Sequence, residues 1–258
     1  MRLSRDNDND FTQDPQPSRG LYVWGMEKTV LPEEMDGRRV RSKEEIAEMV
    51  PPEEGAHYQY SIGIDPSGGR KDPVGLAVLL VTYKGDEVFC ATKYLKRLQP
   101  GLFSDAVKKI HRLYNSLKAS SIQKGGTFDA DLWVDGTGVG LPVVQSLQQE
   151  IPEASIFPVI ITGGYNSRFD AATRTYYISK QTLVSTLLSK LQTQHLRIAK
   201  RSREFDTVVS ELQNFGMKVT DSMNEVYSGM GTSHDDLAVA LMLACTGSDL
   251  VGGPIQLW

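Results

Sequence analysis

Four aspartates stand where secondary-structure elements are expected to begin or end. Asp65 follows an apolar run with strand-like alternation, and Asp135 follows the apolar triplet Leu-Trp-Val. Asp235 and Asp236 precede a long apolar run at the start of an expected helix. Side chains at strand carboxyl ends and helix amino ends can converge on one ligand although they are far apart in sequence. The four aspartates are therefore candidates for a common site.

Carboxylates that are held together repel one another and raise each other's pKa unless a cation neutralises them. Oxygen-only ligands suit magnesium or manganese. Two such ions, about 3.5–4 Å apart, can activate a water molecule and stabilise the leaving oxygen of a phosphodiester. This chemistry predicts a site that binds two Mg²⁺ or Mn²⁺ ions and hydrolyses phosphodiester bonds.

Each acidic position also has an ordinary structural explanation. Asp65 precedes Pro-Ser-Gly-Gly and could be a turn former. Asp135 begins Asp-Gly-Thr-Gly-Val-Gly, which could be a loop that feeds a helix. Asp235 and Asp236 could complement a helix dipole. Together, the three acidic positions are less easily explained by coincidence.

The elements around these positions predict a mixed α/β fold. Residues 58–65, 74–83 and 87–94 have the patterns of three consecutive strands. Further elements are expected as helices at 103–117, 143–147, 181–192, 204–215 and 236–245, and as strands at 132–135, 156–161 (broken by Pro158) and 196–199. Parallel strands need crossover connections, so the order predicts an RNase H-like mixed sheet, a three-strand antiparallel meander plus parallel strands, flanked by helices.

The chain divides into three expected parts. Residues 1–56 are rich in charged residues and proline, which indicates a partly extended N-terminal arm, a possible docking segment, or simple disorder. Ser42 and Glu45 have the spacing of a capping box and predict one short helix in this arm. The nuclease-like domain is expected at 57–248, with a C-terminal tail at 249–258.

The composition excludes several classes of protein. The 258 residues contain 28 Lys and Arg against 32 Asp and Glu, a formal net charge of −4, so any contact with DNA must be local. Only Cys90 and Cys245 are present, which disfavours a disulfide framework or a thiolate zinc site. The sequence shows neither a signal peptide nor a bilayer-spanning run. We expect a reduced intracellular compartment and no membrane partner.

Four segments carry a resemblance to a known family: IGIDPSGGRKDPVGLAVL, LWVDGTGVGLPVVQSL, YYISKQTLVSTL and SHDDLAVALMLA. Over residues 58–246 they resemble, in order, the nuclease domain of tailed-virus terminase large subunits. The resemblance implies an RNase H-like endonuclease that cuts concatemeric viral DNA during genome packaging. It implies Asp65 and Asp135 as catalytic metal ligands. The third ligand is Asp235 or Asp236, with Asp236 slightly favoured.

The chain departs from this family in one respect. Large terminase subunits normally carry an ATPase before the nuclease, and no GxxxxGK[ST] phosphate loop occurs here. Because the chain begins with Met1 and a long non-matching arm, we expect the packaging ATPase to be a separate chain, although a truncated part is the alternative. The implied partners are double-stranded DNA, this ATPase, the portal and the small terminase subunit, in the cytoplasm of an infected host cell.

Several residues are candidates for supporting roles. Lys180 resembles a lysine near the family's catalytic face that could hold the scissile phosphate, and His234 could protonate a leaving group or orient water. Solvated helix-start residues are the ordinary alternative for both. Six basic residues could contact a DNA backbone, or lie in solvated loops: Arg168 and Arg174 in an expected flexible hairpin at 163–174, and Arg197, Lys200, Arg201 and Arg203.

Three other functions compete with this interpretation. A Holliday-junction-type resolvase would share the fold but is usually a dimer with a basic surface. Actin-like and sugar-kinase-like phosphate-binding proteins also use Asp followed by glycine-rich turns, but they need two such halves. A non-catalytic packaging module would make the acidic set incidental.

Overall fold

The computed structural model describes residues 23–24, 57–66, 73–84, 87–164, 166–200, 202–219, 225–229 and 235–252. Most of the expected N-terminal arm, with its helix beginning at Ser42, lies outside this part of the chain, and so does the segment 253–258. None of the helices in the described part combines the length and the apolar character that a membrane span requires.

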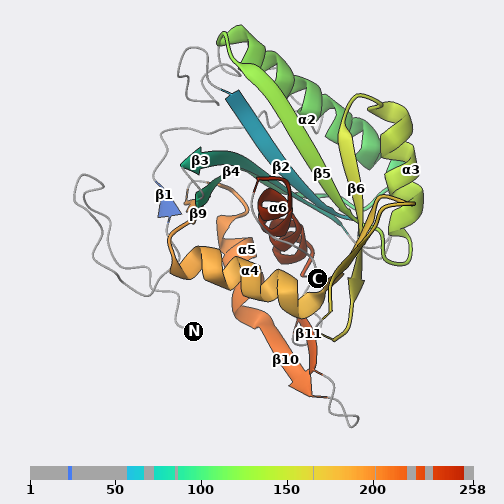
Figure 1. The fold of residues 1–258 in the computed structure, drawn as a ribbon, viewed down its shortest axis with the longest axis vertical. Helices are drawn as coiled ribbons and strands as arrows, with labels where there is room; N and C mark the ends of the chain where they lie inside the picture. The colour runs from blue at the N-terminus through green and yellow to red at the C-terminus, as the bar shows by residue number, and fades with distance from the viewer. Residues whose placement is uncertain are drawn as a thin grey trace, which may run out of the picture.

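A mixed nine-stranded sheet forms the centre of the described part of the chain (Figure 1), in the order β1-β9-β4-β3-β2-β5-β6-β8-β7. Strands β2, β3 and β4 form an antiparallel meander, and β5, β6 and β8 continue the sheet in parallel beside β2. The strands are β1 (Val23–Trp24), β2 (His57–Asp65), β3 (Val74–Lys84), β4 (Glu87–Leu98), β5 (Thr127–Asp135), β6 (Ser155–Thr162), β7 (Arg168–Asp170), β8 (Thr175–Ser179) and β9 (Leu196–Ala199). The predicted RNase H-like mixed sheet is confirmed.

Helices cover both faces of this sheet. Helices α2 (Phe103–Gln123) and α3 (Gly140–Glu150) pack on one face, where the apolar residues of α2 recur every three or four positions. Helices α4 (Lys180–Gln192), α5 (Phe205–Asn214) and α6 (Asp236–Gly252) pack on the other. Each helix therefore joins one of two separate apolar cores.

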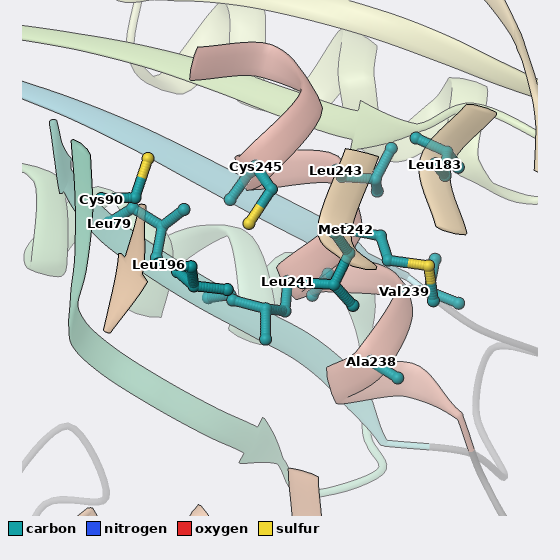
Figure 2. Packing of buried hydrophobic residues seen from close by; sticks show 14 of the residues in the cluster. Leu79, Cys90, Leu183, Leu196, Ala238, Val239, Leu241, Met242, Leu243 and Cys245 are labelled. Atoms are coloured by element: carbon teal, nitrogen blue, oxygen red, sulfur yellow. The ribbon is translucent and has the colours of Figure 1, made fainter. Parts of the chain in front are cut away.

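Helix α6 is buried on all sides over its first ten residues. Residues 237–245 are at most 5% exposed, because the sheet lies beneath the helix and α4 and α5 contact its other sides. Figure 2 shows its side chains among those of β3, β4, β9 and α4. A Cβ at Gly63 of β2 would overlap the carbonyl oxygen of Ala240. The backbone of α6 therefore rests directly on the central strand.

Several elements differ from the sequence expectations. Pro158 does not break β6, because it pairs with Val134 of β5 while the pairing of β6 with β8 begins only at Val159. The expected flexible hairpin contains β7, which pairs with β8. Strands β10 (Phe215–Val219) and β11 (Glu225–Gly229) form an additional antiparallel ribbon. Helix α6 continues to Gly252, so the expected boundary at 248 lies inside a helix.

Candidate active site at the carboxyl ends of β2 and β5

Register places Asp65 and Asp135 on neighbouring strands at the same edge of the sheet. Ile64 pairs with Val134 in the parallel β2–β5 ladder, and each aspartate is the next residue. Side chains alternate along a strand, so both aspartates belong to the face on which Gly63 meets α6. Asp65 and Asp135 therefore lie at the ends of adjacent parallel strands.

The first turn of α6 lies beside Asp65. Gly75 of β3 pairs with Asp65 on one side and with Arg97 of β4 on the other. A Cβ at Gly75 would overlap the carbonyl oxygen of Asp236. Glycine is therefore required here by close approach, and it places the first residue of α6 over β3, between Asp65 and Arg97. Asp236 is 5% exposed.

Asp135 is fixed by the turn that follows it. Its Oδ1 accepts a hydrogen bond from the backbone N–H of Thr137 at 2.8 Å. The Thr137 hydroxyl oxygen accepts one from the N–H of Ile161 at 3.1 Å, which ties the turn to β6. Burial raises the pKa of Asp135, while the hydrogen bonds from Thr137 and the charge of Lys180 oppose this rise.

Lys180 forms an ion pair with Asp235, and its charge also acts on Asp135. It is the first residue of α4, and the Ser179 side chain caps this helix by accepting from the N–H of Thr182 at 3.0 Å. The Nζ of Lys180 lies 3.7 Å from Oδ2 of Asp235. Asp235 thus lies on the Lys180 side of the helix end, whereas Asp236 faces a different cation.

That cation is Arg97, which no sequence pattern had indicated as a site residue, and the same is true of Glu211 of α5. The Nε of Arg97 lies 3.9 Å from Oδ2 of Asp236, and the same guanidinium forms an ion pair with Glu211. Glu211 also accepts a hydrogen bond from the backbone N–H of Ala238 at 2.8 Å. Burial raises the pKa of Glu211, and the Ala238 N–H and Arg97 oppose it. A glutamate three residues after the buried Val208, on the same helix face, was the available signal.

The basic residues expected to contact DNA do not form one surface. Arg168 and Arg174 stack their guanidinium groups over Tyr177 and Phe157, at 3.7 and 5.6 Å from the ring centroids, near the β7 edge. Arg197, Lys200 and Arg203 are exposed at or after β9, toward the other edge of the sheet. Arg201 and His234 lie outside the described residues.

The donor chemistry of this edge suits a hard divalent cation, since its acidic groups are all carboxylates. Among the side chains that the structure describes, however, no three potential metal ligands are gathered closely enough to hold an ion. Asp236 faces Arg97, and Asp235 faces Lys180. Of the four aspartates, Asp235 and Asp236 thus form ion pairs with protein cations.

A mixed sheet in this order, with carboxylates at the ends of its central strands, defines an RNase H-like fold. No family model and no curated protein matches the chain. The large terminase nuclease of thermophilic phage G20c with bound magnesium has the same fold, with a TM-score of 0.51 and 19% sequence identity. The similarity covers 81% of this chain and 98% of that chain. The same nuclease with bound cobalt gives a TM-score of 0.50 at equal identity and coverage. The resemblance to terminase nuclease domains is thus confirmed at the level of the fold.

Proposed function

We propose that this protein is a metal-dependent endodeoxyribonuclease that cleaves phosphodiester bonds by a two-metal mechanism. The observation that carries the proposal is the placement of Asp65 and Asp135 on adjacent strand ends, with the amino end of α6 directly beside them. The G20c nuclease, which shares this fold, binds magnesium in its structure. We therefore expect Mg²⁺ or Mn²⁺ as the cofactor.

Asp65 and Asp135 would hold the ions, with Asp235 or Asp236 as the third carboxylate. Bound divalent ions would activate a water molecule and stabilise the leaving oxygen of the scissile bond. Lys180 is the residue suited to the scissile phosphate, because its side chain is 26% exposed and its ammonium lies beside Asp235. An ion at Asp235 would leave this ammonium available for the DNA backbone.

The biological substrate that we propose is concatemeric viral DNA, cut during genome packaging in the cytoplasm of an infected cell. The terminase nuclease fold supports this proposal, and a packaging ATPase, the portal and the small terminase subunit are the corresponding partners. Because the chain is acidic and its candidate DNA-contacting residues lie toward two flanks of the sheet, such partners would strengthen its hold on the duplex.

One observation favours a second candidate, a non-catalytic packaging module. Asp235 and Asp236 each have a protein cation as a neighbour, and the described side chains contain no assembled metal-ligand cluster. In such a module Lys180 and Arg97 would permanently neutralise the acidic edge, and divalent ions would have no effect.

A plasmid-cleavage assay separates the two candidates. Wild-type protein, Asp65→Asn and Asp135→Asn are incubated with supercoiled plasmid at low salt, with Mg²⁺, Mn²⁺ or EDTA. Asp129→Asn is a matched control, since Asp129 is an exposed aspartate of the same strand as Asp135. Metal-dependent nicking that is lost only in the first two variants supports the nuclease. Absence of cleavage by folded wild-type protein with either metal supports the module.

A further inference from the structure

The amino end of α6 carries a buried ionic group that connects three elements. Arg97 of β4, Glu211 of α5 and Asp236 of α6 have side chains that are 24%, 4% and 7% exposed. Two carboxylates thus share a single guanidinium in a largely desolvated place. Removal of one member of such a group changes the partners that remain for the other two.

The guanidinium is shared unequally. Arg97 forms a direct ion pair and hydrogen bond with Oε1 of Glu211, while its Nε lies 3.9 Å from Oδ2 of Asp236. The other oxygen of Glu211 accepts the N–H of Ala238 at 2.8 Å. Glu211 therefore fixes the first turn of α6 and at the same time is the principal partner of Arg97.

We propose that Glu211 is a positioning residue, which prevents Arg97 from pairing fully with Asp236 and so keeps Asp236 able to bind a divalent ion. This inference rests on the proposed nuclease function. Without the charge of Glu211, the donors of Arg97 can pair more closely with Asp236, the other carboxylate that contacts this guanidinium. A fixed cation on Asp236 then competes with the divalent ion.

Mn²⁺ affinity of the full chain, measured by isothermal titration calorimetry without DNA, tests the inference. Glu211→Gln keeps a side-chain oxygen that can accept the Ala238 N–H, but it loses the charge that holds Arg97. Second-sphere changes of this kind alter metal affinity by about 10–100-fold, and we expect a loss of roughly tenfold. The double variant Arg97→Gln/Glu211→Gln also removes the competing cation. It should regain most of the wild-type affinity.

A buried ion pair at the opposite end of α6 provides the matched control. Lys190 of α4 contacts Asp249 of α6 at 2.5 Å, and Lys190 is 6% exposed. Asp249→Asn should lower the melting temperature by breaking this pair, while Mn²⁺ affinity stays at the wild-type value. The control separates loss of stability from loss of metal affinity.

The outcomes distinguish the inference from the function on which it rests. If the wild type binds no Mn²⁺, or if Asp65→Asn leaves binding unchanged, the proposed function and the inference both fail. If Asp65→Asn weakens binding but Glu211→Gln does not, or if the double variant binds more weakly than the single one, only the inference is overturned. If circular dichroism shows that Glu211→Gln is not folded, the Mn²⁺ affinity of Arg97→Gln tests the inference instead. The inference predicts undiminished affinity for it, and a tenfold loss would contradict the inference.

Discussion

Gly75→Ala is predicted to separate the acidic residues without changing any of them. The added Cβ would overlap the backbone carbonyl oxygen of Asp236, and backbone atoms on both sides leave no flexible side chain to move away. The first turn of α6 must retreat by on the order of 1 Å to restore an ordinary contact. Overpacking of this kind costs about 1–3 kcal/mol in unfolding free energy. The better strand propensity of alanine than of glycine offsets less than about 1 kcal/mol of this cost.

The effect on cleavage should exceed the effect on stability. A displacement of about 1 Å at a catalytic group can reduce the rate on the order of 100-fold. The assay is the rate of metal-dependent plasmid cleavage per folded molecule, with folded fractions taken from urea denaturation curves. Gly63→Ala is the matched control, because its Cβ would overlap the carbonyl oxygen of Ala240, one turn farther along the same helix. It should lose stability similarly but less activity.

Two results would refute this reasoning. Wild-type stability of Gly75→Ala would show that α6 does not rest on β3 as closely as the structure indicates. A destabilised Gly75→Ala variant with full cleavage per folded molecule would show that the position of Asp236 relative to Asp65 is not important for catalysis.

Three further predictions concern other parts of the molecule. Burial raises the pKa of Asp131 from 3.8 to about 6, so ionisation of this side chain lowers the stability of the protein as the pH rises from about 4 to 6. Asp131→Asn should therefore raise the melting temperature at pH 8 but not at pH 3.5. An equal change in melting temperature at both pH values would contradict this prediction. Lys180→Gln should reduce the cleavage rate at least tenfold without changing the Mn²⁺ affinity. An equal loss of Mn²⁺ affinity, measured by titration calorimetry, would show instead that the lysine contributes to metal binding. Neutralising Arg197, Lys200 and Arg203 together should make the slope of log K for DNA binding against log salt concentration less steep, by up to about 0.9 for each DNA phosphate that these side chains neutralise. An unchanged slope would show that they are not part of the DNA interface.

The sequence predicted the part of this site that depends on local pattern. Apolar alternation placed Asp65 at the end of a strand, and the apolar run after Asp236 gave a helix start. The rule that parallel strands need a crossover indicated that parallel strands follow the meander, but it left open which strand β5 would pair with. The sequence therefore identified Asp65 and Asp135 as strand-end residues, whereas the pairing of β2 with β5 that brings the two strand ends together is a property of the fold.

The missing parts depend on contacts between distant segments. Arg97 and Glu211 lie 114 positions apart and meet only because α5 packs beside α6 and β4. No periodicity indicates that Arg97 would face Asp236 across Gly75. Strands β7 and β8 have three and five residues, too few for a clear alternation between glycines and turns.

The interpretation of the basic residues was limited in the same way. Arg168 and Arg203 are equally plausible DNA contacts in a linear sequence, but the sheet order places them toward opposite flanks. Pro158 indicated a broken strand because proline removes a ladder hydrogen bond. The strand continues, since its pairing with β8 begins one residue later.

Anomalous diffraction from crystals soaked in Mn²⁺ would test most directly whether this edge is a divalent-ion site. We predict Mn²⁺ peaks at coordinating distance, about 2.0–2.3 Å, from carboxylate oxygens of Asp65 and Asp135, with Asp235 or Asp236 turned from its protein cation toward the metal. The same soak of Asp65→Asn crystals should lose at least one peak. Well-ordered wild-type crystals with no Mn²⁺ beside either aspartate, Lys180 still at Asp235 and Arg97 still at Asp236, would contradict the proposal.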